Sequence, residues 1–75
     1  MKYRTIDGAK FTADSYQDLA EQLWQSQFIP PPTLEEWMKG SAHRAKMWNG
    51  SELRTDTVEH HIEDMLAAEL IEALQ

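Results

Sequence analysis

The sequence predicts one α+β domain over residues 1–75, with a small antiparallel sheet and three helices in the order ββααβα. The sheet is expected to consist of an N-terminal hairpin and a short third strand, because apolar residues alternate on both sides of Asp7-Gly8. Three later segments repeat apolar residues at helical spacing, and each follows a residue suited to cap a helix. A chain of 75 residues without Cys has room for one small core and no disulfide framework.

The hairpin is predicted over residues 1–13. A three-residue loop that ends at a left-handed Gly8 pairs Tyr3 with Phe11 and collects the apolar residues on one face. A two-residue turn would instead pair Arg4 with Phe11 and mix charged and apolar groups on each face. The three-residue loop is therefore the expected register.

The first helix is predicted over residues 16–27, with Asp14-Ser15 as its N-cap. The run Pro30-Pro31-Pro32 ends this helix and forms a stiff extended connector. Phe28 and Ile29 stand just before the prolines. We expect these two side chains to close the edge of the core.

The second helix is predicted to begin at the capping box Thr33-Leu34-Glu35-Glu36 and to stop at Asn49-Gly50. Trp37 and Trp48 fall on its apolar stripe, so both are expected to be buried. Met47 lies off that stripe, which makes it a candidate for contact with a partner.

The segment 51–55 is expected to add the third strand, with Leu53 directed inward. Asp56 or Thr57 then caps the third helix, whose apolar stripe begins at Val58. This assignment places the last helix after the last strand.

The helical pattern changes after Ala68, because three aliphatic residues, Leu70, Ile71 and Leu74, gather on the side opposite the earlier apolar stripe. Two interpretations remain open. In the first, the helix ends near Ala68, and Leu70 and Ile71 fold back to close the core. In the second, the helix runs on to Leu74 and offers these residues to a partner, most simply a second copy of the chain.

No combination of residues typical of a catalytic site is recognisable in the sequence. There is no Cys, no Ser with the His and Asp spacing of a nucleophile, and no Gly-rich phosphate loop. His60 and Asp64 form an i, i+4 pair that could hold a divalent ion, but two ligands make an incomplete site. We therefore expect no catalytic residue, no metal site and no cofactor, and we do not expect an enzyme.

Acidic residues dominate the C-terminal quarter of the chain. Residues 56–75 contain six Asp and Glu and no Lys or Arg, in a chain whose formal net charge is −6. An acidic surface attracts basic surfaces and repels nucleic acid, so the expected partner is a protein with a basic surface and not a nucleic acid. The expected acidic contacts are Glu59, Glu63, Asp64, Glu69 and Glu72, with Glu35 and Glu36 second. The candidate apolar contacts are Leu70, Ile71, Leu74, Trp24 and Met47.

Membrane association and secretion are not expected. No apolar run approaches the roughly 20 residues that cross a bilayer. The segment 1–5 lacks the apolar stretch of a signal peptide. A cytoplasmic location in the host cell is therefore the expectation.

The hairpin with Phe11, the helix 16–24, the segment 33–38 and the segment 53–57 before an acidic helix form a recognisable layout. This layout resembles small proteins of phages and mobile elements, including some anti-CRISPR inhibitors. The resemblance implies a non-enzymatic inhibitor that docks on a basic, nucleic-acid-binding surface of a host CRISPR-Cas effector and blocks it. One departure is Glu69, which stands where such a helix would commonly close with Gly. The alternative is a small homodimeric regulatory or antitoxin-like protein.

Overall fold

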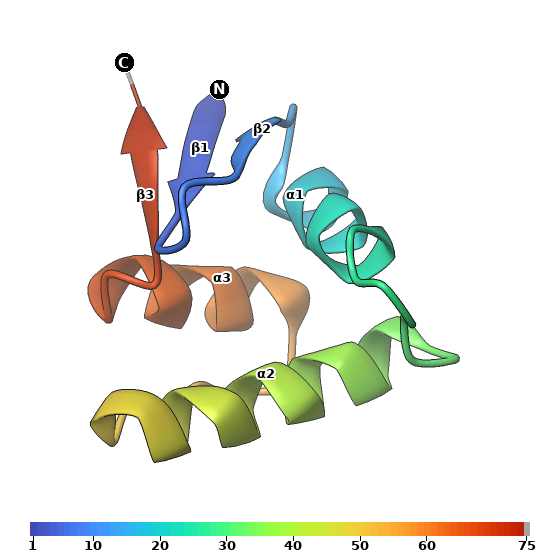
Figure 1. Ribbon diagram of the computed structural model, residues 1–75, viewed down its shortest axis with the longest axis vertical. Coiled ribbons are helices and arrows are strands. Elements are labelled where there is room, and N and C mark those ends of the chain that lie inside the picture. The colour runs from blue at the N-terminus through green and yellow to red at the C-terminus, as the bar shows by residue number, and fades with distance from the viewer. Residues whose placement is uncertain (75) are drawn as a thin grey trace.

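The computed structural model describes residues 1–74 and combines three helices with one three-stranded antiparallel sheet (Figure 1). The predicted α+β class is therefore confirmed. The order of the elements is strand, strand, helix, helix, helix, strand. The predicted order ββααβα is wrong in its last two elements, because the third strand follows the third helix.

The sheet has the order β2-β1-β3, with β1 in the centre. Its strands are β1 (Lys2–Thr5), β2 (Lys10–Thr12) and β3 (Ile71–Leu74). Tyr3 lies opposite Phe11, so the predicted hairpin register is confirmed. The Thr5 N–H donates to the Ala9 carbonyl at 2.8 Å, and Gly8 has a φ of 94°. Because the left-handed region favours Gly, this residue sets the three-residue loop and hence the register.

The segment 51–55, expected to form the third strand, has no regular secondary structure. Leu53 is buried as predicted, but it reaches the core from an irregular connection. The free edge of β1 is occupied by β3 instead, with Thr5 opposite Ile71 and Arg4 opposite Glu72. One strand edge accepts one partner, so pairing with β3 leaves no place on β1 for a strand at 51–55.

The helices are α1 (Tyr16–Gln25), α2 (Leu34–Asn49) and α3 (Val58–Ala67). The side chains of Ser15, Thr33 and Thr57 cap them by accepting backbone N–H groups three residues later. Gly50, with a φ of 77°, ends α2 as the sequence predicts. Each helix therefore begins where a local side chain satisfies the first backbone donors.

The C-terminal end of α3 decides between the two interpretations of the chain after Ala68. The Glu69 N–H donates to the Leu66 carbonyl at 3.1 Å, and the Leu70 N–H donates to the Met65 carbonyl at 3.0 Å. These two bonds, with Glu69 at a φ of 61°, form a Schellman motif that reverses the chain. The helix therefore ends near Ala68, as in the first interpretation.

The residues after this turn form β3, which neither interpretation predicted. Ile71 is 2% exposed and belongs to the core. Leu70 and Leu74 are half-buried. The second interpretation, a helix that runs on and offers Leu70, Ile71 and Leu74 to a second copy, is therefore wrong, because Ile71 already packs inside its own domain.

The core receives side chains from the sheet, from all three helices and from the connection before α3. Its apolar members are Tyr3, Ala13, Leu19, Ala20, Leu23, Trp37, Met38, Ala45, Leu53, Ile62, Met65 and Ile71. In Figure 1, α3 lies between the sheet and α2, so α2 is the helix farthest from the sheet.

Three large apolar residues expected in the core lie in solvent instead. Trp48 is 70% exposed, although the buried Trp37 occupies the same stripe of α2. The last buried residue of α2 is Ala45, so its final turn extends past the core. Phe28 and Ile29 are 99% and 80% exposed, because the proline connector carries them away from the core instead of over its edge.

Candidate interaction surface

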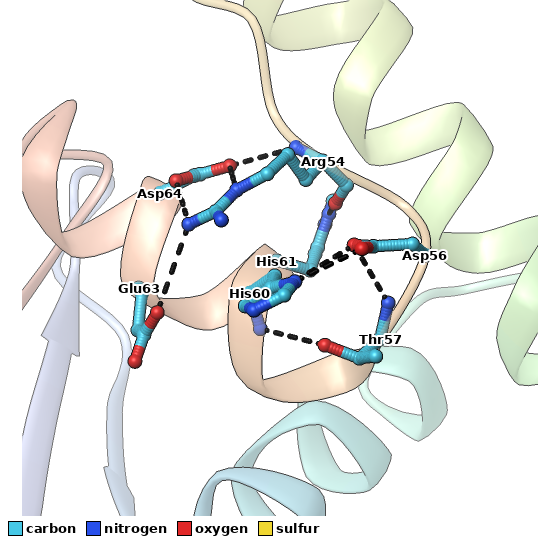
Figure 2. Close-up of polar contacts among 7 residues, drawn as sticks. All are labelled: Arg54, Asp56, Thr57, His60, His61, Glu63 and Asp64. Carbon is cyan, nitrogen blue, oxygen red and sulfur yellow. Dashed lines mark hydrogen bonds and ion pairs between the residues drawn. The ribbon is translucent and has the colours of Figure 1, made fainter.

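A polar cluster lies where the connection after α2 meets α3, and Figure 2 shows its members. The backbone N–H of Arg54 donates to Asp64 Oδ2 at 2.8 Å. Its guanidinium donates to both oxygens of the same carboxylate, at 2.9 and 3.0 Å. The hydrogen bonds from Arg54 lower the pKa of Asp64 to about 2. Arg54 Nη2 also lies 3.7 Å from Glu63 Oε1, so one arginine holds two of the predicted acidic contacts.

His60 belongs to the same cluster but contacts Asp56 instead of Arg54. Its Nδ1 lies 3.0 Å from both oxygens of Asp56, and this contact lowers the pKa of Asp56. The i, i+4 pair of His60 with Asp64 is not formed, because Asp64 is bound to Arg54. Within residues 1–74, no three His, Asp or Glu side chains are grouped to hold a metal ion.

His61 is the polar residue that the sequence interpretation missed. It is fully buried, and its Nδ1 lies 2.8 Å from the Arg54 carbonyl (Figure 2). Burial lowers the pKa of His61, and its Nε2 has no hydrogen-bond partner in the described part of the chain. The spacing carried a usable signal, because His61 stands three residues after Val58 and four before Met65.

The predicted acidic contacts do not form one uninterrupted surface. They come from α3, from the turn after it, from β3 and from the first turn of α2. Arg54 binds Asp64 and approaches Glu63, and Arg4 pairs with Glu72 across the sheet. Glu35 lies 3.3 Å from Lys39. Glu59, Glu69 and Glu36 are exposed, and none of them forms an ion pair with another described residue.

The predicted apolar contacts also differ from one another in their exposure. Met47 is 76% exposed, as its position off the stripe suggested. Trp24 is half-buried, and its indole Nε1 donates to the Pro31 carbonyl at 2.7 Å. Trp24 therefore holds the connector between α1 and α2, which is a role that no helical pattern could reveal.

A groove that the sequence interpretation missed lies between the hairpin, the end of α1 and α2. Its volume is about 700 Å³. Core residues, among them Leu23, Trp37 and Met65, form its base, and the exposed Ile6 and Trp48 line it as well. The charged residues that line it are Asp7 and Arg44. This groove opens the core to solvent along one side of a small domain.

The Arg54–Asp64 pair joins the connection before α3 to α3 itself, through hydrogen bonds made within the domain. None of the helices in residues 1–74 combines the length and the apolarity needed to span a membrane. No protein-family model, no curated protein and no solved structure matches the chain.

Proposed function

We propose that the chain is a non-enzymatic interaction domain that docks on a basic protein surface through the acidic side of α3 and the turn after it. One observation carries this proposal. Residues 56–75 hold six acids and no Lys or Arg, and Glu59, Glu63 and Glu69 are exposed. Arg54 and Arg4 neutralise only part of that charge.

The proposed mechanism is competition with nucleic acid. Lys and Arg residues that hold phosphates are the natural targets of a carboxylate-rich surface. The resemblance to anti-CRISPR inhibitors makes a CRISPR-Cas effector in the host cytoplasm the first target to test. Binding of the acidic side of α3 would occupy the basic groups that guide RNA or target DNA requires.

The geometry narrows the proposed contact set. Asp64 is 20% exposed and bound by Arg54, so it serves the fold more than a partner. Glu72 is paired with Arg4, and Glu35 with Lys39. Glu59 and Glu69 are exposed and form no ion pair with another described residue, and Glu63 is exposed and only approached by Arg54, at 3.7 Å. We assign the contact to these three residues on the α3 side.

The test is a charge-reversal variant, Glu59→Lys with Glu63→Lys and Glu69→Lys, assayed against purified CRISPR-Cas effectors with and without bound nucleic acid. The matched control reverses three exposed acids elsewhere, Asp14→Lys with Glu21→Lys and Glu52→Lys. Both variants change the net charge equally, so a difference between them isolates the α3 side.

The α3 variant should lose binding mainly through a slower on-rate, and wild-type binding should weaken as salt rises past about 0.15 M. The control variant should retain most of its on-rate. Undiminished binding by a folded α3 variant contradicts the proposal. Equal losses in both variants would assign the effect to net charge and not to this surface.

A homodimeric regulatory or antitoxin-like protein is the second candidate function. The observation that favours it is different, namely the large apolar side chains that the single chain leaves in water. The surface first expected for such a dimer, Leu70, Ile71 and Leu74, is excluded because Ile71 lies in the core. A dimer would therefore need another surface.

A further inference from the structure

The connector between α1 and α2 carries an apolar tip at Phe28 and Ile29. Phe28 is 99% exposed and Ile29 is 80% exposed, so neither side chain contributes to the core. We call these two residues the Phe28–Ile29 tip. A soluble domain gains nothing from two adjacent large apolar side chains in water, and such exposure marks an interaction site.

The Phe28–Ile29 tip is held in place on both sides. Before it, the Ser26 hydroxyl donates to the Leu23 carbonyl at 2.8 Å and closes the end of α1. After it, the Trp24 indole donates to the Pro31 carbonyl at 2.7 Å, and three consecutive prolines stiffen the chain. A tip ordered before binding loses less entropy when a partner covers it.

The surroundings of the tip select an uncharged partner surface. Residues 25–33 contain no charged side chain, in a chain of which 27% of the residues are charged. A basic or acidic binding site would leave its own charges without partners against this segment. The tip therefore fits an apolar groove.

The chain itself contains such a groove. The groove of about 700 Å³ between the hairpin and α2 falls within the range of roughly 300–1,000 Å³ that binding pockets occupy. Along α2 it follows one stripe of residues, from Trp37 through Ser41 and Ala45 to the exposed Trp48. Ser26 and Gln27 line it as well, so it begins directly beside the Phe28–Ile29 tip.

We propose that the groove binds the Phe28–Ile29 tip of a second copy of the chain, in a symmetric dimer with two identical contacts. The connector between α1 and α2, which carries the tip, leads into the N-terminal end of α2 (Figure 1), whereas Trp48 belongs to the last turn of that helix. A two-fold axis that crosses the groove near Ser41 makes the two α2 helices antiparallel. Each tip then lies at the Trp48 end of the other groove, which gives an isologous interface.

Charges are few in the groove, as an uncharged tip requires. Asp7 and Arg44 are the charged residues that line it, one of each sign. The groove therefore adds no net charge against the tip of a second copy.

The apolar area available is of the size that a stable dimer needs. Two aromatic residues, Phe28 and Trp48, bury about 150–250 Å² each when covered. Ile6, Ile29 and the base of the groove add to this area, which approaches the roughly 800 Å² per partner of a standard interface. The net charge of −6 on each copy opposes association, so added salt should strengthen this dimer.

Sedimentation equilibrium of the purified chain from about 1 μM to 1 mM tests the proposal, since this range spans weak to moderate dimers. The wild-type chain should show a concentration-dependent dimer mass. Phe28→Asp should raise the dimer Kd by at least about 30-fold, the effect of losing a central apolar anchor. Met47→Asp is the matched control, because Met47 is exposed on the same helix but does not line the groove. It should leave Kd within about threefold of the wild-type value.

A mixing experiment tests whether tip and groove meet each other. Trp48→Asp should also weaken the dimer, and an equimolar mixture of Phe28→Asp and Trp48→Asp chains should dimerise more strongly than either variant alone. Only the mixed dimer keeps one contact in which both residues are intact. Circular dichroism should show both variants folded, because Phe28 and Trp48 lie outside the core.

A wild-type chain that stays monomeric over the whole range overturns the proposal. A dimer that Phe28→Asp leaves unchanged, or that weakens as salt is added, also overturns it. The charge-reversal variant of Glu59, Glu63 and Glu69 should still dimerise, because these residues do not line the groove. The test of the dimer is therefore independent of the proposed acidic contact.

Discussion

The rings of Trp37 and His61 pack edge to face, with centroids 5.3 Å apart and planes inclined by 71°. This contact joins α2 to α3. The other side of the same junction is closed by His61 Nδ1, which lies 2.8 Å from the Arg54 carbonyl. One histidine therefore connects two helices and the irregular segment between them.

Trp37→Ala should lower the free energy of unfolding by about 3–5 kcal/mol, because it leaves a cavity beneath His61 and removes a large buried ring. Domains of this kind have only about 5–15 kcal/mol in total, so the loss should be close to complete unfolding. Urea denaturation followed by circular dichroism measures it. Trp48→Ala, on the exposed end of the same helix, should stay within about 0.5 kcal/mol of the wild type when measured in dilute protein. A Trp37→Ala chain of wild-type stability would contradict the core assigned here.

Acidification from pH 7.5 to 5.5 should destabilise the protein through His61. Burial lowers the pKa of His61 below its ordinary value of about 6.5. The unfolded chain therefore binds the proton first, and the stability present above about pH 6.5 is lost as pH falls toward the lower folded pKa. Urea midpoints at the two pH values measure the loss.

The variant His61→Phe tests whether His61 causes this pH dependence. A phenyl ring retains the packing against Trp37 but cannot titrate or bond the Arg54 carbonyl. It should be less stable at pH 7.5 by about 1–3 kcal/mol, and its stability should change less between the two pH values. An unchanged pH slope in His61→Phe would show that His61 does not cause the pH dependence.

Asp64→Asn should destabilise the protein at pH 7 by about 1 kcal/mol, a modest value because solvent screens part of the pair with Arg54. The pKa of Asp64 is lowered to about 2, below the ordinary value of about 3.9. Its stabilisation is therefore complete above about pH 4 and is lost as pH falls toward 2. The difference in urea midpoint between wild type and variant should shrink over that window. Glu59→Gln, an exposed change on the same helix, should show no such difference at either end.

Glu69→Gly should stabilise the protein by about 1 kcal/mol. Glu69 has a φ of 61°, a left-handed conformation that costs a residue with a side chain roughly 1–2 kcal/mol and that Gly adopts freely. A rise of several degrees in Tm, about 4–8 °C per kcal/mol for a domain of this size, is the expected readout. Glu72→Gly, made in β3 three residues later, should instead lower Tm. A lower Tm for Glu69→Gly would contradict the Schellman motif.

Ile71→Glu should unfold most of the protein, with a loss of at least about 3 kcal/mol, because a carboxylate replaces a core side chain. Ala73→Glu, two residues later on the same strand, should be tolerated because Ala73 is exposed. Urea denaturation followed by circular dichroism measures the loss. An Ile71→Glu chain of near wild-type stability would contradict the core position of Ile71.

Local interactions account for most of what the sequence predicted correctly. The left-handed Gly8 sets the hairpin register, and the side chains of Ser15, Thr33 and Thr57 start the helices. These features join residues only a few positions apart, so the order of residues is enough to reveal them. The burial of Trp37 follows from spacing in the same way.

The candidate surfaces were predictable only in part. The acidic character of residues 56–75 is a property of composition, and exposed acids on α3 follow from it. The ion-pair partners of those acids do not follow from composition, because Arg54 lies 10 positions from Asp64 and Arg4 lies 68 positions from Glu72. The groove combines residues from Thr5 to Ile71, so no single segment of the sequence contains its pattern.

The tertiary structure alone decided the place of the third strand and the fate of the apolar residues outside the core. The segments 51–55 and 71–74 are both short, and the difference between them is which one reaches the open edge of β1. That pairing joins the two ends of the chain, since Lys2 lies opposite Leu74, and its stability depends on burial of Ile71 against the helices. Trp48 shares a stripe with Trp37 but stays exposed, because burial requires a neighbouring element and spacing on a helix does not supply one.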